Sequence, residues 1–122
     1  MAEGHDVKKD LAEWRRRIDA IDEQLMRLLN SRSACAVEIG RIKREAGLPV
    51  YAPEREAWIL DRVMRENPGP LDPLAVRRVF ERIIDESRRL ERVASEAEAE
   101  EGQRLEEAAL ETLRKQQKGT GE

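Results

Sequence analysis

Apolar residues follow a heptad pattern along residues 11–46, and only one polar position interrupts it. They are Leu11, Trp14, Ile18, Ile21, Leu25, Leu28, Cys35, Ile39, Ile42 and Ala46. This spacing predicts one amphipathic helix from about Lys8 or Asp10 to about Ala46, which Gly47 and Pro49 end. Such a helix would be about 55 Å long, which exceeds the width of a domain of this size. Two short helices cannot cover its apolar face, so we expect a second chain beside it.

Two further helices are expected after the first. Pro53, followed by acidic residues, predicts the start of the second helix, which ends before the segment at 67–70. Asp72 and Pro73 predict the N-cap and first turn of the third helix. The apolar stripe of that helix consists of Val76, Val79, Phe80, Ile83, Ile84 and Leu90. No segment alternates as a β-strand does, so the predicted fold class is all-α.

The length of 122 residues predicts one folded domain with two appended segments. We place a flexible N-terminus at 1–9, the domain at 10–94 and an acidic tail at 95–122. The tail is rich in Glu, Ala, Gln and Lys, and its few leucines give only a broken apolar stripe. It is expected either to prolong the third helix, to form a short fourth one, or to be disordered.

Composition excludes several classes of protein. The net charge is −3 and 40% of residues are charged, with no dominant basic stripe, which argues against a nucleic-acid partner. No apolar stretch is long enough to cross a bilayer and no signal sequence is recognisable, so we expect a cytoplasmic protein without a membrane partner. A lone His5 rules out a clustered zinc site, and no metal is expected. The single Cys35 is expected to be a small buried apolar residue.

Several polar residues occupy positions where apolar ones are expected. Arg32 interrupts the heptad pattern, and Lys43 follows on nearly the same helix face. Ser87 and Glu91 lie one turn apart on the stripe of the third helix. Each alone has an ordinary structural explanation, such as an ion pair or a side chain that reaches solvent. Together they predict a cavity in which cations outnumber carboxylates, suited to a small dianion. Because it lacks a nucleophile, such a site would act by positioning and electrostatic stabilisation.

The chain resembles the all-helical, AroQ-type chorismate mutases (chorismate mutase type II) in five stretches. They are WRRRIDAID at 14–22, LLNSR at 28–32, EIGRIK at 38–43, PVYAPERE at 49–56 and IIDES at 83–87. The resemblance implies a three-helix fold with a long first helix, assembled as an intertwined homodimer. It also implies the rearrangement of chorismate to prephenate, in phenylalanine and tyrosine biosynthesis, without a cofactor.

The same resemblance implies a site with residues from both chains. Arg15 would reach into the partner's site, Arg32 would hold a substrate carboxylate, and Lys43 would donate to the ether oxygen of the breaking bond. The other implied binding residues are Ala52 through its backbone N–H, Arg55 at the loop–helix junction, Glu56 as acceptor from the ring hydroxyl, Ser87 near a carboxylate, and Glu91.

Glu91 departs from the commonest form of the family, in which a glutamine donates to the ether oxygen. A carboxylate cannot donate this hydrogen bond, but a protonated carboxyl group can. Burial would raise the pKa of Glu91, whereas Lys43 and the arginines would lower it. We therefore expect Glu91 to be a catalytic residue together with Lys43 and Arg32, and activity to decline as pH rises.

Two alternative functions fit the same residues. An isochorismate-pyruvate lyase on this scaffold would use the same cationic contacts to substrate carboxylates. A non-catalytic helical dimerisation or regulatory module would keep the site only as a vestige or an effector sensor. The full set of cations argues against the second alternative, because charges in an apolar interior are costly without a ligand.

Overall fold

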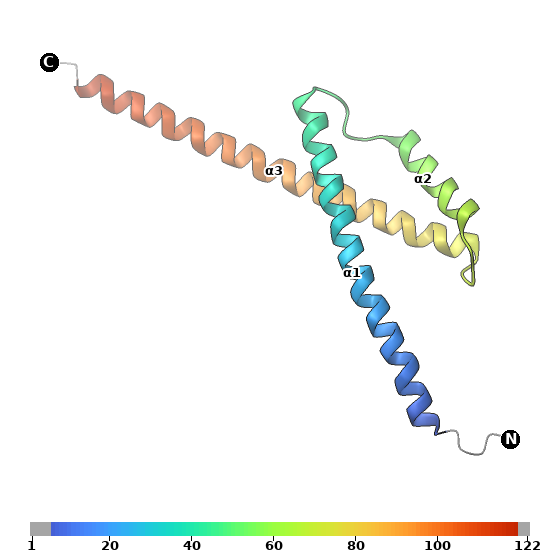
Figure 1. The fold of residues 1–122 in the computed structure, drawn as a ribbon. Coiled ribbons are helices and arrows are strands. Elements are labelled where there is room, and N and C mark those ends of the chain that lie inside the picture. The colour runs from blue at the N-terminus through green and yellow to red at the C-terminus, as the bar shows by residue number, and fades with distance from the viewer. Residues whose placement is uncertain (1–5, 120–122) are drawn as a thin grey trace. The chain divides into compact units, whose positions relative to one another are not determined.

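The computed structural model describes residues 6–119, which form three helices. These are α1 (Val7–Glu45), α2 (Pro53–Glu66) and α3 (Pro73–Gly119) (Figure 1). No strand occurs within residues 6–119. The predicted all-α, three-helix fold with a long first helix is therefore confirmed. The chain divides into two compact units, Met1–Cys35 and Ala36–Glu122, so that α1 contributes to both.

Both ends of α1 are fixed by local hydrogen bonds. The Asp6 carboxylate accepts from the backbone N–H of Lys8 at 3.0 Å, and the helix begins at Val7. This start lies inside the segment 1–9 that was expected to be flexible, of which residues 1–5 lie outside the described residues. At the other end Gly47 has a φ of 70°, and Leu48 N–H donates to the Lys43 carbonyl at 2.8 Å. This is a Schellman C-cap, whose left-handed residue is most easily a glycine.

Helices α2 and α3 form an antiparallel hairpin in which α2 packs along the first part of α3 (Figure 1). Pro53 opens α2, as predicted. The connection is held by Asn67, whose side-chain amide donates to the Leu71 carbonyl at 2.6 Å, and it contains a cis Gly69–Pro70 bond. The Asp72 carboxylate then accepts from Ala75 N–H at 2.9 Å, which confirms the predicted N-cap of α3.

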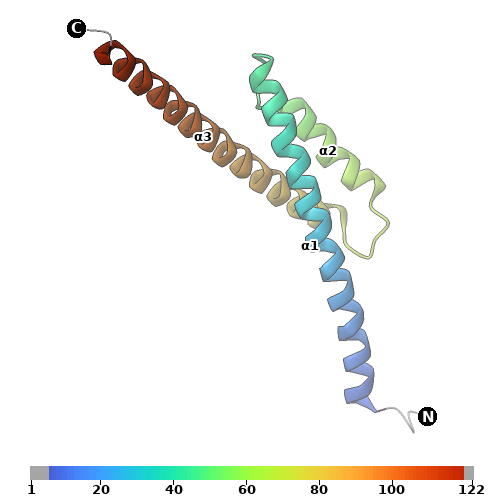
Figure 2. The same ribbon diagram turned by 60° about the vertical axis from the view of Figure 1, so that its left-hand side comes forward.

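Helix α3 is 47 residues long and unbroken (Figures 1 and 2). It passes residue 94, where the composition changes, and runs to Gly119. Residues 95–119 thus prolong the third helix, and residues 120–122 lie outside the described residues. None of the three helices combines the length and the apolar character needed to cross a membrane over the described part of the chain.

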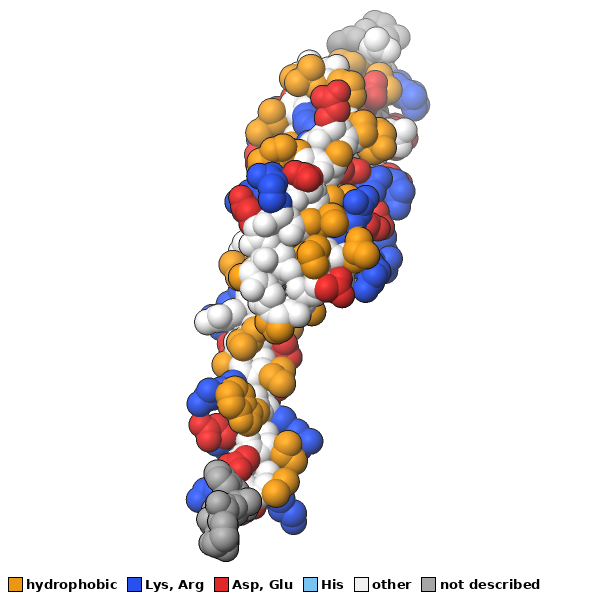
Figure 3. Space-filling view, turned by 90° about the vertical axis from the view of Figure 1, so that its right-hand side faces the viewer, with side chains coloured by type: hydrophobic (Ala, Val, Ile, Leu, Met, Phe, Trp, Pro, Cys, Tyr) orange, Lys and Arg blue, Asp and Glu red, His pale blue; other side chains and the backbone are white. Residues whose placement is uncertain are grey.

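The chain by itself buries few side chains. Ile84 and Ser87 of α3 are 6% and 7% exposed, and Gly40 of α1 is buried. The heptad residues of the first unit are exposed, from 47% at Leu11 to 66% at Leu28. Figure 3 shows hydrophobic side chains along this N-terminal part of α1. Cys35 is exposed as well, contrary to the expectation of a buried residue, because it stands on the same uncovered heptad face.

Candidate functional site

The predicted site residues are divided between the two units. Arg15 and Arg32 belong to the first unit, where Arg15 is exposed and Arg32 is half-buried. The second unit holds the other six, which are Lys43 of α1, Ala52, Arg55 and Glu56 at the start of α2, and Ser87 and Glu91 of α3. The structure therefore brings the last turns of α1, the first turn of α2 and the middle of α3 into one compact unit.

Lys43 is fixed through both its backbone and its side chain. Its carbonyl accepts the Schellman hydrogen bond from Leu48, and its Nζ donates to the Val50 carbonyl at 3.4 Å. The side chain is half-buried. The ammonium group is thus held near the loop that leads into α2, where it acts electrostatically on Glu91.

Glu91 is half-buried on α3 and lies against Gly40 of α1. A Cβ built on Gly40 would lie 3.5 Å from Glu91 Cγ and 3.6 Å from Cδ. Burial raises the pKa of Glu91 above its ordinary value, and the negative charge of Glu56 acts in the same direction. The cations Lys43, Arg44 and Arg88 lower it, but burial is the largest effect. The structure therefore favours the protonated form of this carboxyl group, relative to an ordinary glutamate.

Ser87 and Glu56 complete the polar groups of this region. Ser87 is buried on α3, one turn before Glu91. Glu56 is half-buried on α2 and forms an ion pair with Arg88 of α3 at 3.2 Å. Arg88 also pairs with Asp85 at 2.7 Å, and its guanidinium lies 5.9 Å from the Tyr51 ring centroid. Sequence reasoning missed Arg88, although its position directly after Ser87 could have indicated it.

The remaining predicted residues lie at the start of α2. Ala52 is the N-cap residue, and its carbonyl accepts from Glu56 N–H at 3.1 Å. Ala52 offers no side-chain cap, which is consistent with a role expected of its backbone alone. Arg55 is exposed, and its guanidinium lies over the Trp58 ring at 4.6 Å from the centroid. The cation–π contact holds the cation at the surface of α2.

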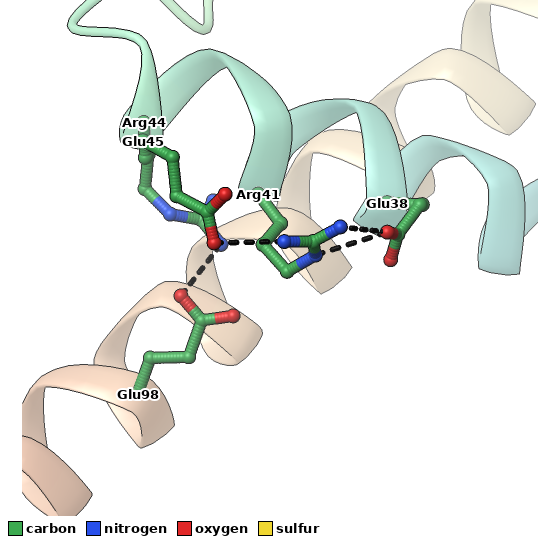
Figure 4. Close-up of polar contacts among 5 residues, drawn as sticks. All are labelled: Glu38, Arg41, Arg44, Glu45 and Glu98. Atoms are coloured by element: carbon green, nitrogen blue, oxygen red, sulfur yellow. Dashed lines mark hydrogen bonds and ion pairs between the residues drawn. The ribbon is translucent and has the colours of Figure 1, made fainter.

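A group of charged residues joins the last turns of α1 to α3 (Figure 4). Arg44 pairs with Glu98 of α3 at 3.0 Å, whereas Arg41 pairs with Glu38 and, at 2.7 Å, with Glu45. The hydrogen bonds from Arg41 lower the pKa of Glu38. Arg44 was not predicted from the sequence. It stands four residues after Gly40, and this spacing places it on the glycine's face, beside α3.

These groups allow hydrogen bonding and charge stabilisation rather than covalent catalysis. The region offers an ammonium group, a carboxyl group with a raised pKa and a buried hydroxyl, each on a rigid helix. Within residues 6–119, no group of three or more His, Cys, Asp or Glu side chains is arranged to hold a metal ion. Fixed polar groups of this kind can stabilise charge that develops during a reaction.

The sequence model of one protein family, chorismate mutase type II, matches residues 14–92, well over half of the 122 residues. The chain belongs to the chorismate mutase type II family. All eight predicted site residues lie within the matched range, from Arg15 to Glu91. The helical segment 95–119 lies outside it.

Individual relatives agree with the family assignment. A chorismate mutase structure from Thermus thermophilus (form II) has a TM-score of 0.67 and 36% identity, and the match covers 68% of this chain and 94% of that one. The bifunctional chorismate mutase/prephenate dehydratase of Pseudomonas aeruginosa is 44% identical over 82 residues, which are 63% of this chain and 22% of that protein. The chorismate mutase of Methanocaldococcus jannaschii is 40% identical over 55 residues, which are 45% of this chain and 56% of that protein. The chain thus spans about a fifth of the length of the bifunctional relative.

Proposed function

We propose that this protein is a chorismate mutase, which converts chorismate to prephenate. The observation that carries the proposal is that Lys43 acts electrostatically on Glu91, and both residues lie within the range that the family model matches. Lys43 is held by Leu48 and Val50, and Glu91 has a raised pKa because it is buried against α1. Wherever Glu91 is protonated, it and the Lys43 ammonium are two hydrogen-bond donors for one oxygen atom of a substrate. The family assignment supports this substrate and this reaction.

The reaction is a Claisen rearrangement within one molecule. The ether C–O bond breaks while a new C–C bond forms, and negative charge grows on the ether oxygen. The Lys43 ammonium and the protonated Glu91 donate hydrogen bonds to this oxygen and stabilise the transition state more than the ground state. No nucleophile and no cofactor is required, because the bonding electrons rearrange within the substrate.

The other residues bind and orient the substrate in this proposal. Arg32 and Arg55 hold carboxylates, Ser87 donates to one of them, and Ala52 contributes its backbone N–H. Glu56 accepts from the ring hydroxyl. The ion pair between Glu56 and Arg88 supports this role, because the guanidinium fixes the position of the Glu56 carboxylate.

The assembly in this proposal is a homodimer with two shared sites. Its support is the exposed heptad face of α1, on which Trp14 is 60% and Ile18 is 55% exposed in the chain by itself. A continuous apolar stripe of this length normally indicates an interface. Arg15 lies on the same part of α1 and would supply a cation to the partner's site. We propose a cytoplasmic location for the dimer.

Substitution of Lys43 tests the proposal. Wild-type protein should consume chorismate and release prephenate, and Lys43→Met should lose at least about a hundredfold in kcat/KM, a typical cost of removing one oxyanion-stabilising donor. Arg41→Met is the matched control, since Arg41 lies two residues away and is engaged by Glu38 and Glu45. Equal activity of all three proteins would exclude the proposed role of Lys43. Turnover of isochorismate to salicylate and pyruvate, without prephenate from chorismate, would favour the lyase.

A further inference from the structure

One ion pair connects the segment beyond the family match to the last turn of α1. Glu98 lies six residues after the end of the matched range, and its Oε2 accepts from Arg44 Nη2 at 3.0 Å (Figure 4). The Arg44 side chain is 23% exposed and that of Glu98 is 51% exposed. The guanidinium is therefore partly withdrawn from water, whereas the carboxylate remains exposed.

The same guanidinium lies beside Glu91. Arg44 Nη1 is 3.1 Å from the position of a Cβ on Gly40, and Glu91 Cδ is 3.6 Å from that same position. The Arg44 guanidinium and the Glu91 carboxyl group thus both lie beside Gly40. Arg44 lies within reach of two carboxyl groups, the ion-paired Glu98 and the functional Glu91.

We propose that Glu98 is a positioning residue, which holds Arg44 in an ion pair and so keeps this guanidinium from pairing with Glu91. The proposal rests on the function proposed above, in which protonated Glu91 donates to the substrate. It assigns a role in the site to the C-terminal extension of α3. Glu98 does not touch the substrate, and it acts through Arg44.

Other charged groups around Glu91 do not replace Glu98 in this role. Lys43 approaches from α1, Glu56 from α2 and Arg88 from α3. Arg88 is engaged by Glu56 and Asp85. Without the charge of Glu98, the Arg44 guanidinium is released to pair with an ionised Glu91. An opposite charge at this distance favours the ionised carboxylate, so the pKa of Glu91 should fall.

The direct test is the pKa of Glu91 in Glu98→Gln, measured by NMR on protein labelled with 13C at the glutamate carboxyl groups. The Glu91 signal is assigned by its absence in Glu91→Gln. We expect the Glu91 pKa in Glu98→Gln to be lower by roughly half a unit, the size of a partly screened charge interaction. Glu100→Gln, which removes an exposed charge two residues away, should leave it unchanged. An unchanged pKa in Glu98→Gln, or an equal fall in Glu100→Gln, would overturn the proposal.

A double-mutant cycle shows whether Arg44 transmits the effect. In the Arg44→Gln background, Glu98→Gln should no longer lower the pKa of Glu91. An undiminished shift in that background would mean that Glu98 acts directly, and the positioning role would be wrong. These measurements need no substrate, so they are independent of the proposed reaction.

The pH profile then links the positioning role to catalysis. The descending limb of kcat/KM against pH should move to lower pH in Glu98→Gln by the same amount as the Glu91 pKa. The shift should vanish when Glu91 is replaced by glutamine. A shifted Glu91 pKa in a protein that does not turn over chorismate would refute the mutase but keep the ion-pair mechanism. Normal turnover of chorismate, together with a Glu91 pKa that Glu98→Gln does not change, would keep the mutase and refute the ion-pair mechanism.

Discussion

Gly40 of α1 and Glu91 of α3 approach so closely that a Cβ on the glycine would lie 3.5 Å from Glu91 Cγ. That is an ordinary van der Waals distance, and the tighter neighbour is Arg44 Nη1 at 3.1 Å. One extra methyl group therefore requires only a small movement of a flexible guanidinium. A longer side chain would have to displace the carboxyl group that we propose as a proton donor.

Substitutions of Gly40 should separate stability from activity. Gly40→Ala should raise the free energy of unfolding by up to about 1 kcal/mol, because alanine is the better helix former. Gly40→Leu should lower kcat/KM at least tenfold, because its branched end occupies the position of the Glu91 side chain. Thermal unfolding and steady-state kinetics on both variants provide the measurement. Full activity of Gly40→Leu would contradict the close packing described here.

The pH dependence of activity should depend on Glu91. Burial raises the pKa of this carboxyl group, so its protonated form prevails at low pH and is lost as pH rises through the raised value. The kcat/KM of the wild type should fall in that range, whereas Glu91→Gln should show no such fall, because an amide donates at every pH. A flat wild-type profile, or the same decline in Glu91→Gln, would exclude this role.

The free energy of unfolding should also depend on pH through Glu91. Because the folded-state pKa of Glu91 is above the ordinary value, its proton contributes stability that is complete below the unfolded-state pKa. That contribution is lost as pH rises through the folded-state pKa. Denaturant unfolding over a pH series should show this loss in the wild type and a smaller one in Glu91→Gln. If the free energy of unfolding changes equally with pH in both proteins, the pKa of Glu91 is not raised by folding.

Arg32 should be a binding residue rather than a structural one. Leucine suits a heptad position, so Arg32→Leu should leave the proposed dimer assembled. Its kcat/KM should nevertheless collapse, since leucine cannot hold a carboxylate. Sedimentation across a dilution series, with activity on the same samples, makes the comparison. A stabilised dimer with full activity would show that the charge has no part in catalysis.

Shared sites predict complementation between two inactive variants. In a heterodimer of Arg15→Ala and Lys43→Met, one site receives Lys43 and the partner's Arg15 intact, and the other site lacks both. After subunit exchange in an equal mixture, about a quarter of the wild-type activity should return. If the two variants are each inactive, and their mixture stays inactive after subunit exchange has been verified, the site is not shared between the chains.

The helix starts and stops were largely predictable because they depend on local chemistry. Pro53 and Asp72 specify where α2 and α3 begin, and Gly47 specifies the end of α1, each through bonds within a few residues. The unbroken course of α3 could not be predicted in the same way. Its extension has few large apolar residues, and either a helix or a disordered segment was compatible with that composition.

The polar contacts between distant residues were less predictable. The positions of Lys43, Ser87 and Glu91 followed from apolar periodicity and from the family resemblance. The pairs Arg44–Glu98 and Arg88–Glu56 join residues far apart in the sequence, and many arginines of this chain could have made them. Only packing around Gly40 and between α2 and α3 selects the partners. The exposure of Cys35 likewise depends on what covers the heptad face, which one chain does not specify.

The most direct test of the central claim is the reaction of purified protein with chorismate. The loss of chorismate absorbance should be followed with wild-type protein and with Arg32→Ala, and the product should be identified. We predict prephenate from the wild type and a collapse of the rate in the variant. Intact chorismate in the presence of wild-type protein would contradict the proposed function.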